Sequence, residues 1–410
     1  MNLESLLFPI GLEEFNRTYW SKQFLRIARD NTKYYNDMFS EVDMENTLYI
    51  ASRFPGAVQE IAEDTVIRTI HTPEDAVNTF NAKRSLRINA IQRFSITLEK
   101  LTRNLAKVIS SPININLYMS PFSGQKALPR HYDLHDVIVL QISGRKKWKI
   151  FEPRVELPLE TLPRLQYETN DDVRRFRVQE LGGGRDCVEM ASEFVVEPGD
   201  LLYLPRGFYH EALTDNDAGA SCHLTIGVKP TTYLDLFALA LADAAYADPR
   251  LRGHLPLGLA KSAPLQSEAI RAFNEISRDL PTHFNSNKAL SKYIGLLHRA
   301  HKGSLQNQLF SRQATATDIN ALTIDSRLGV RDGTLLGLDY SSSPVHLCFG
   351  ENRFAIEDDY IEACQFLCDN SDFSSSMLPG PLTAQQKLTL LRQLMVENIV
   401  FMREQSHAAA

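Results

Sequence analysis

The fold of this chain is decided by the stretch Pro198-Gly199-Asp200-Leu201-Leu202-Tyr203-Leu204-Pro205-Arg206-Gly207-Phe208-Tyr209-His210. Its apolar centre, Leu201–Leu204, lies between the turn signals Pro-Gly-Asp and Pro-Arg-Gly, which is typical of a short strand between tight turns. Similar β-branched and aromatic runs occur at 113–118, 137–142, 147–151, 194–196 and 223–228. Many short strands joined by tight turns predict a sandwich or jelly-roll barrel.

The regions on either side of these strands have a different character. Residues 1 to about 110 mix short helical patterns with polar turns, and the spacing of apolar residues becomes helical after Pro230. Short strands and helices follow after about residue 320, where Thr383 and Gln386 form a capping-box signature. We therefore predict a mainly β protein with α, in three parts: a barrel domain at 1–232, a helical region at 233–315 and a mixed module at 316–410. Residues 154–192 form a polar insertion in the barrel.

Composition and charge narrow the class of protein. The chain has 410 residues and a net charge of −6, so it lacks the basic excess of a general nucleic-acid binder. Its five cysteines form no CxxC pair, which favours a reducing compartment. No apolar run approaches the roughly 20 residues that span a bilayer, and the first residues lack the pattern of a signal peptide. We expect a cytoplasmic protein without a membrane segment.

Two histidines and one aspartate are spaced to meet at a metal ion. On an extended strand, residues i and i+2 point to the same face roughly 6.7 Å apart, so His131 and Asp133 can reach one ion. The pattern His-x-Asp also occurs by chance, but His210 supplies a third ligand from a strand that must pair nearby. This set is typical of a facial-triad iron(II) site, whereas zinc sites usually carry three or four N or S ligands. His135 lies too far along a straight strand and is expected to line the pocket.

A 2-oxoacid co-substrate at such a site needs a cation for its distal carboxylate. The candidates are Arg145, Lys146, Lys147 and Lys149. If Ser143-Gly144 closes a two-residue hairpin loop, Gln141 pairs with Lys146, and Lys146 shares the inward face of the metal ligands. Lys147 then faces outward and suits a solvated strand edge. Parity therefore selects Lys146, although the chain must bend somewhere after Asp133.

Three polar residues are candidates for further contacts with the co-substrate. Asn116 and Tyr118 share one face of the strand upstream of the metal ligands, and Thr225 lies on a late strand. For each of them a hydrogen-bonded polar group inside the barrel is an equally good interpretation.

Four stretches together resemble the cupin-like JmjC ribosomal oxygenases, which are iron(II)- and 2-oxoglutarate-dependent protein hydroxylases. They are Asn116-Leu117-Tyr118-Met119-Ser120-Pro121, Pro129-Arg130-His131-Tyr132-Asp133, the run from Val139 to Trp148, and Pro198 to Ala212. The resemblance implies a double-stranded β-helix barrel, a helical dimerisation region near 233–310 and a C-terminal winged-helix-like module.

The resemblance also assigns roles. His131, Asp133 and His210 would hold iron, Lys146 would bind the 2-oxoglutarate carboxylate, and Asn116 and Tyr118 would contact the co-substrate. O₂ would be the second co-substrate, and the product would be a ribosomal-protein side chain hydroxylated at its β-carbon. A homodimer is implied as well.

Other functions fit the same residues. The substrate could be a peptide natural-product precursor or a free amino acid, and demethylation of methyl-lysine would use the same oxidant. A non-catalytic cupin and winged-helix interaction protein is a different class, against which the complete set of metal ligands argues. A cupin isomerase or dioxygenase without 2-oxoglutarate would not need Lys146. The long 154–192 insertion leaves the substrate open.

Overall fold

The computed structural model describes residues 1–62, 65–121, 126–153, 156–158, 189–214, 219–300, 316–331 and 335–403. Most of the predicted insertion at 154–192 lies outside these residues. The chain consists of two compact units, Met1–Pro230 and Thr231–Ala410. None of the helices that the structure describes combines the length and the apolar character needed to cross a membrane.

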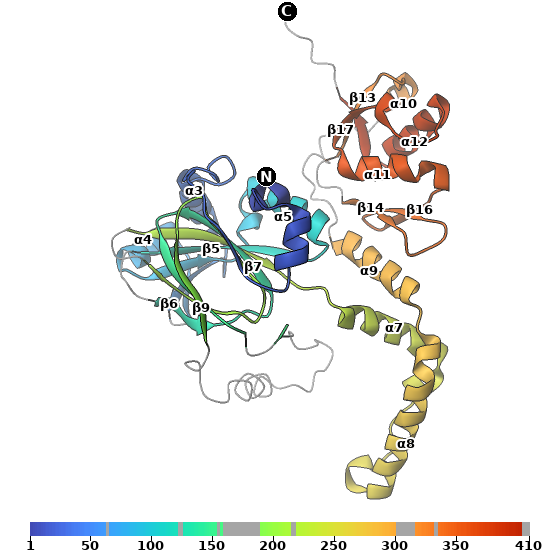
Figure 1. Cartoon of the computed structure of the whole chain (residues 1–410), viewed down its shortest axis with the longest axis horizontal. Coiled ribbons are helices and arrows are strands. Elements are labelled where there is room, and N and C mark those ends of the chain that lie inside the picture. Colours follow the sequence, from blue (N-terminus) through green and yellow to red (C-terminus); the bar gives the residue numbers. More distant parts are fainter. Residues whose placement is uncertain are drawn as a thin grey trace, which may run out of the picture. The chain divides into compact units, whose positions relative to one another are not determined.

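Unit 1 contains two antiparallel sheets (Figure 1). In strand order, the larger consists of β1 (Leu25–Ile27), β10 (Leu201–Leu204), β7 (Asp136–Ser143), β12 (Ser221–Val228), β5 (Ile113–Ser120), β4 (Ser85–Ile88), β2 (Val58–Ala62) and β3 (Thr65–Ile70). The smaller consists of β6 (Lys126–His131), β11 (Tyr209–Thr214), β8 (Lys146–Phe151) and β9 (Met190–Val196). This is the mainly β, cupin-like architecture that the short strands predict.

A hydrophobic cluster joins the two sheets and shows that they face each other. Val137, Val139 and Leu202 of the larger sheet pack with Trp148 and Ile150 of the smaller one. Successive side chains of a strand point to opposite faces, so the residues next to these five point to the outer faces of the sheets. Any side chain in register with these five therefore points into the space between the sheets.

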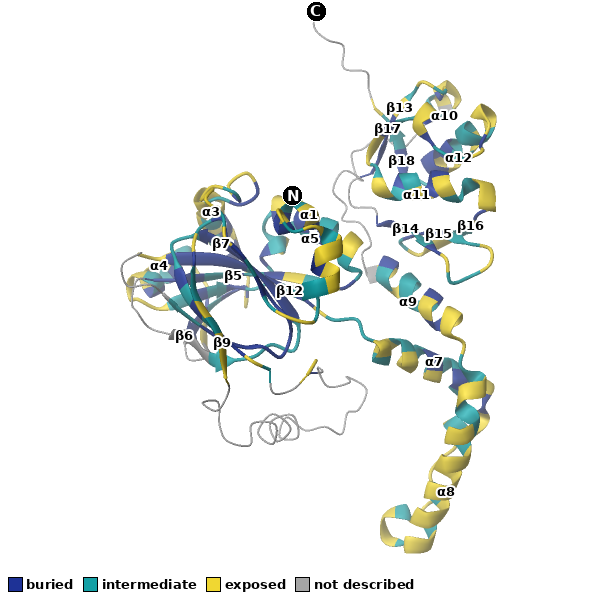
Figure 2. Ribbon diagram, in the orientation of Figure 1, coloured by how far each residue is buried: buried dark blue, intermediate teal, exposed yellow. Residues whose placement is uncertain are grey.

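The outer face of the larger sheet is covered by the N-terminal helices. These are α1 (Leu3–Leu7), α2 (Leu12–Glu14), η1 (Phe15–Tyr19), α3 (Glu41–Ala51), α4 (Pro73–Asn81), η2 (Ile91–Arg93) and α5 (Ile96–Ile109). Helix α5 buries Leu98, Leu101 and Leu105 in the same core as β5 and β12, and Figure 2 shows the strands beneath it mostly in the colour of buried residues. Trp20 stacks on Tyr203 with ring centroids 5.8 Å apart. The N-terminal segment thus closes one side of the barrel.

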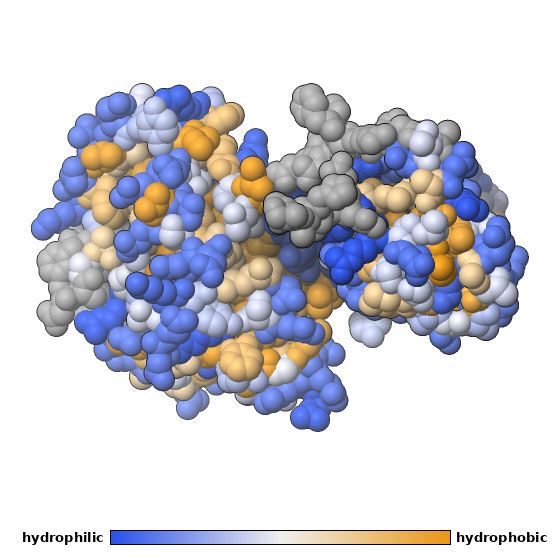
Figure 3. Space-filling view, turned by 90° about the horizontal axis from the view of Figure 1, so that it is seen from above, coloured by the Kyte–Doolittle hydropathy of each residue, from blue (hydrophilic) through white to orange (hydrophobic). Residues whose placement is uncertain are grey.

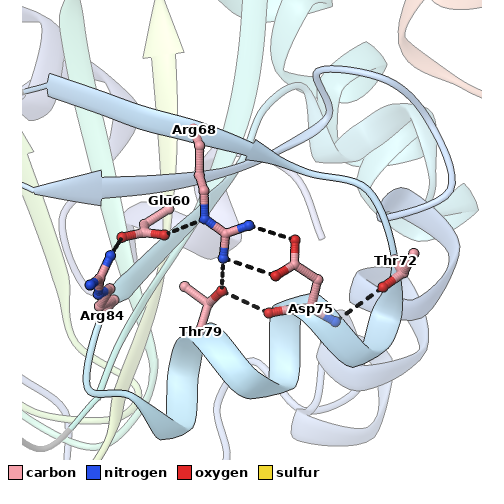
Figure 4. Close-up of polar contacts among 6 residues, drawn as sticks. All are labelled: Glu60, Arg68, Thr72, Asp75, Thr79 and Arg84. Atoms are coloured by element: carbon pink, nitrogen blue, oxygen red, sulfur yellow. Dashed lines mark hydrogen bonds and ion pairs between the residues drawn. The ribbon is translucent and has the colours of Figure 1, made fainter.

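A polar cluster on β2, β3 and α4 holds the far edge of the larger sheet together (Figure 4). The buried Glu60 carboxylate accepts hydrogen bonds from Arg68 at 2.9 Å and Arg84 at 2.6 Å. Arg68 also binds both oxygens of Asp75, at 2.7 and 2.8 Å, and the hydroxyl of Thr79 at 2.8 Å. Every oxygen of the buried carboxylate therefore has a charged partner from the chain itself.

The predicted hairpin between Gln141 and Lys146 is wrong. Strand β7 pairs with β10 and β12, whereas β8 pairs with β11 and β9 in the other sheet. Gly144, at φ +61°, packs so closely on Ala220 that a Cβ would lie 2.0 Å from the Ala220 carbonyl oxygen. The turn therefore passes from one sheet to the other. Lys146 nevertheless faces inward, because it lies two residues from the interior Trp148.

Unit 2 begins with helices and continues as a mixed module. Its elements are α7 (Tyr233–Ala247), η3 (Pro249–Arg252), η4 (Leu259–Lys261), α8 (Ala263–Asp279), η5 (Leu280–His283), α9 (Ser286–Ala300), α10 (Ala316–Ala321), β13 (Arg327–Val330), β14 (Leu336–Asp339), β15 (His346–Phe349), β16 (Asn352–Ala355), η6 (Asp358–Tyr360), α11 (Ile361–Asp369), β17 (Asp372–Ser374), η7 (Ser375–Met377), α12 (Ala384–Val396) and β18 (Val400–Met402). The sheets run β17-β13-β18 and β14-β15-β16. The predicted capping box between Thr383 and Gln386 is confirmed.

The hydrophobic core of unit 2 lies in its C-terminal module. Leu328, Leu347, Leu367 and Leu391 are buried together there. Helix α8, in contrast, has no buried residue and appears mostly exposed in Figure 2. Apolar residues also appear among hydrophilic ones on the surface drawn in Figure 3.

Candidate metal centre

The three predicted metal ligands converge at the end of the smaller sheet. His131 is the last residue of β6, and it lies directly opposite His210 of β11. One donor atom each from His131, Asp133 and His210 lies within 4.8 Å of the other two. Asp133 Oδ2 is 3.7 Å from His210 Nε2, and the two imidazole centroids are 4.4 Å apart. Two nitrogens and one carboxylate oxygen at these separations can hold one ion.

The loop after His131 places the carboxylate. Strand β6 ends at His131 and β7 begins at Asp136, so the intervening residues carry the chain from one sheet to the other. The sequence predicts a bend after Asp133 without giving its position, and the bend lies in this loop. The Gly207 amide donates a hydrogen bond to the Asp133 carbonyl at 3.1 Å, which ties the loop to the turn before His210. Two of the ligand-bearing segments are thus fixed to each other by their backbones.

His135 lies outside the group of metal donors. A Cβ on Gly227 would lie 2.9 Å from Cδ2 of His135, so the imidazole rests directly on the glycine of β12. A role in lining the pocket stays a prediction for this residue.

The hydrogen bonding of His210 prepares it to bind a metal. Its Nδ1 lies 3.1 Å from the Phe208 carbonyl oxygen. Because a carbonyl only accepts, Nδ1 carries the proton and Nε2 presents its lone pair towards Asp133. Burial, and then the neighbouring His131, lower the pKa of His210 from 6.5 to about 4. A neutral ring with a free Nε2 is the form that coordinates a cation.

Lys146 is a buried cation in the same interior. Only 3% of it is exposed, and it forms no ion pair with any residue that the structure describes. Burial lowers the pKa of its ammonium from 10.5 to about 8. An unpaired ammonium group is costly to bury, so the site is suited to an anion that is not part of the chain.

Tyr118 and His223 form a stacked aromatic pair on the interior face of the larger sheet. They are paired across β5 and β12, and their rings stack with centroids 5.2 Å apart. The Trp148 ring lies edge-on to His223, with ring centroids 6.0 Å apart, and its centroid is 5.9 Å from that of His210. Burial is the main cause that raises the pKa of Tyr118, so its hydroxyl keeps its proton. Tyr118 was a predicted site residue, whereas His223 was not.

The other two candidates form the next pair along the same strands. Thr225 lies directly opposite Asn116, and both share the interior face with Tyr118. The Asn116 carbonyl oxygen accepts hydrogen bonds from Ala90 N at 3.1 Å and from Asn114 Nδ2 at 2.9 Å. The Asn116 amide group also donates a hydrogen bond to Tyr118, so one amide hydrogen remains for a ligand. Whether Asn116, Tyr118 and Thr225 contact a co-substrate stays a prediction.

Arg87 is a further cation on this interior face, and the sequence patterns did not identify it. Arg87 lies directly opposite Tyr118 on β4, and it donates a hydrogen bond to Gln59 of β2 at 2.6 Å. With His223 and Gln141 these residues form a continuous cross-strand row. This row depends on strand pairing, which local sequence patterns do not reveal. For His223 alone the sequence offers a signal: it lies two positions before Thr225 on the same strand and therefore shares its face.

The chemistry of the donor set fits ferrous iron and an anionic co-substrate. A set of two imidazoles and one carboxylate leaves coordination positions open, as oxygen chemistry at iron(II) requires. The unpaired Lys146 matches one negative charge beyond the metal. The residues present therefore fit both groups.

Known proteins are similar to this chain over regions much longer than the metal site. Residues 89–236 match the family model described as a JmjC domain. Ribosomal oxygenase 2 of Rattus norvegicus is 28% identical over 306 residues, which cover 70% of this chain and 61% of that protein. Ribosomal oxygenase 1 of Homo sapiens is 32% identical over 255 residues, which cover 60% of this chain and 37% of that protein. The chain is therefore similar to the ribosomal oxygenases over a region that includes the JmjC-domain match and the metal donors.

The similarity to further known proteins varies in extent. A protein of Aedes aegypti named bifunctional lysine-specific demethylase and histidyl-hydroxylase NO66 is 30% identical over 266 residues, covering 62% of this chain and 39% of that protein. The chain thus spans about two fifths to three fifths of these relatives' length. YcfD, a ribosomal oxygenase from Escherichia coli solved with cobalt and 2-oxoglutarate, shares the fold: its TM-score is 0.55 at 16% identity, covering 97% of this chain and 99% of that chain.

Proposed function

We propose that this protein is an Fe(II)- and 2-oxoglutarate-dependent oxygenase that hydroxylates an aliphatic side-chain carbon of a protein or peptide. One observation carries the proposal: three donors suited to iron share one barrel interior with a buried, unpaired ammonium group. The JmjC-domain match and the cobalt and 2-oxoglutarate complex of YcfD support the same cofactor and co-substrate.

In this proposal the chain holds and orients the reactants. His131, Asp133 and His210 hold iron, and Lys146 fixes the distal carboxylate of 2-oxoglutarate. Iron(II), when bound, supplies the oxidative chemistry in which 2-oxoglutarate and O₂ give succinate and CO₂ while one oxygen atom enters the substrate. The Phe208 carbonyl keeps the proton of His210 on Nδ1, away from the reacting groups.

The interior also provides further co-substrate contacts and an apolar surround. Tyr118, Asn116 and Thr225 offer a hydroxyl, an amide and a second hydroxyl towards the co-substrate. Val139, Trp148 and Ile150 close the interior with hydrocarbon and exclude water.

The proposed substrate is a ribosomal protein, hydroxylated at the β-carbon of a side chain. The names of the ribosomal oxygenase relatives support this class. A second candidate is demethylation of methyl-lysine, because the Aedes aegypti relative carries that activity in its name together with histidyl hydroxylation. A peptide natural-product precursor or a free amino acid remains an alternative substrate.

Unit 2 is proposed to contribute a homodimer interface and a winged-helix-like module. On α7 and α8, Phe237 is 57% exposed, Ile270 61% and Phe273 69%, so these helices present apolar surface to a second copy. The three-stranded sheet β17-β13-β18 with α10 and α12 is the winged-helix-like part. Light scattering of the full chain tests the interface: we expect a dimer for the wild type and a monomer for Phe273→Asp.

The activity is tested by succinate release from 2-oxoglutarate with Fe(II), followed by intact-mass screening of ribosomal proteins. We expect succinate formation and a product heavier by one oxygen atom. A product lighter by one methyl group would favour demethylation. Absence of both binding and turnover of 2-oxoglutarate would contradict the proposal and favour a non-catalytic interaction protein.

A further inference from the structure

His223 is a buried polar side chain that the proposed function does not use. It lies on β12 between Tyr118 of β5 and Gln141 of β7, and only 4% of it is exposed. Its Nδ1 is buried without a hydrogen-bond partner among the described residues. A buried imidazole nitrogen without a partner costs free energy, so its position calls for a ligand.

The ring of His223 is held firmly in place by its neighbours. It is almost parallel to Tyr118, with 5° between the ring planes, and nearly perpendicular to Trp148, with 77°. The Trp148 ring also contacts the metal ligand His210, with ring centroids 5.9 Å apart. One indole therefore contacts both His223 and a metal donor.

Lys146 reaches the same part of the interior from the opposite sheet. It lies on β8, two residues from Trp148, and its positive charge acts on His223. Burial first, and then this charge, lower the pKa of His223 well below 6.5. The ring is neutral, so it has one N–H donor and adds no second positive charge.

Resting on the proposed function, we infer that His223 is a positioning residue for 2-oxoglutarate: its N–H donates to the distal carboxylate that Lys146 neutralises. One carboxylate then meets one cation and one neutral donor. This arrangement gives a partner to the ammonium of Lys146 and to the Nδ1 of His223.

The test measures binding rather than turnover. Fe(II)-loaded full-length protein is titrated without O₂, and the quenching of tryptophan fluorescence is followed, since Trp148 contacts His223. The two probes are 2-oxoglutarate and pyruvate, a 2-oxoacid without a distal carboxylate. His223→Phe keeps an aromatic ring against Tyr118 and removes both nitrogens, whereas His223→Gln keeps an N–H donor.

We expect His223→Phe to raise the Kd for 2-oxoglutarate at least about tenfold, the value of one hydrogen bond to a charged group. Its Kd for pyruvate and for Fe(II) should stay within about twofold of the wild type, on the same hydrogen-bond scale. His223→Gln should recover part of the lost affinity. Unchanged metal and pyruvate binding also shows that the variants fold.

Three results would overturn the inference. They are an unchanged Kd for 2-oxoglutarate in His223→Phe, an equal loss for both probes, and an equal loss in the Phe and Gln variants. In each of these cases the wild type still binds 2-oxoglutarate, so the proposed function survives. Failure of the wild type to bind 2-oxoglutarate would overturn both.

Discussion

Unit 1 contains two clusters of buried polar groups that differ in one respect. At the edge of the larger sheet, both oxygens of Glu60 have an arginine partner from the chain (Figure 4). Between the sheets, the Lys146 ammonium has no ion-pair partner among the described residues and His223 Nδ1 has no hydrogen bond. The first cluster is complete as folded, whereas the second lacks an anion and an acceptor.

This difference separates a structural cluster from a binding site. Both charged partners of the Glu60 carboxylate belong to the chain, so its contribution to stability does not depend on a ligand. An unpaired ammonium beside three metal donors costs stability and gains it back when a ligand binds the folded state. Substitutions in the two clusters should therefore have opposite effects on stability and on binding.

The largest effect is expected from the metal ligands. Asp133→Ala should lower the affinity for Fe(II) by more than about 100-fold, because loss of residues that only support metal ligands already costs 10–100-fold. Succinate release should disappear. Asp75→Ala is the matched control, since the Asp75 side chain is 29% exposed and that of Asp133 is 30%. Equal metal affinity in both variants, measured by calorimetry, would place the metal elsewhere.

Lys146→Met should stabilise the free protein and abolish tight 2-oxoglutarate binding. The folded-state pKa of Lys146 is about 8, against 10.5 for an ordinary lysine. Between these values the unfolded chain binds more protons, so the stability of the wild type rises with pH. The variant should be more stable by about 3 kcal/mol below pH 8, and the difference should vanish near pH 10.5. Urea unfolding across this range measures it, and a difference independent of pH would contradict the prediction.

Glu60→Gln should destabilise unit 1 and leave binding intact. Removing one partner of a buried ion pair leaves the other charge uncompensated, at a cost of about 3–5 kcal/mol when both are buried. Here Arg68 and Arg84 are 44% and 58% exposed and can turn to water, so about 2 kcal/mol is expected. Urea unfolding gives the cost. A changed Kd for 2-oxoglutarate would break the distinction between the two clusters.

Thr383→Ala in unit 2 should have the smallest effect. The Thr383 hydroxyl accepts from Gln386 N at 3.3 Å, and Gln386 Oε1 accepts from Thr383 N at 2.9 Å. Loss of such an N-cap costs about 1 kcal/mol. Circular dichroism during urea unfolding should show a less stable transition, with 2-oxoglutarate binding unchanged. Weaker binding would mean that completed polar groups outside the barrel also affect the site.

Local rules predicted the parts of the site that lie close together in the sequence. The i and i+2 alternation placed His131 with Asp133, because a strand repeats every two residues. The pairing of His131 with His210 followed from the requirement that two strands meet.

Long-range pairing limited what the sequence could predict. The inward direction of Lys146 was inferred through a hairpin that does not exist, since Gly144 packs on Ala220 and sends β8 to the other sheet. Arg87 and His223 were missed because they meet Tyr118 only through the order β12-β5-β4. Local patterns such as alternation and turn residues do not reveal which strands become neighbours.

The most direct measurement is a titration of the Fe(II)-loaded full chain with 2-oxoglutarate in the absence of O₂, followed by visible absorbance. A saturable change at one equivalent is expected for the wild type, with no change for Asp133→Ala and weaker binding for Lys146→Met. Absence of a saturable change in the wild type, or the same curve in all three proteins, would contradict a ligand site built from these residues.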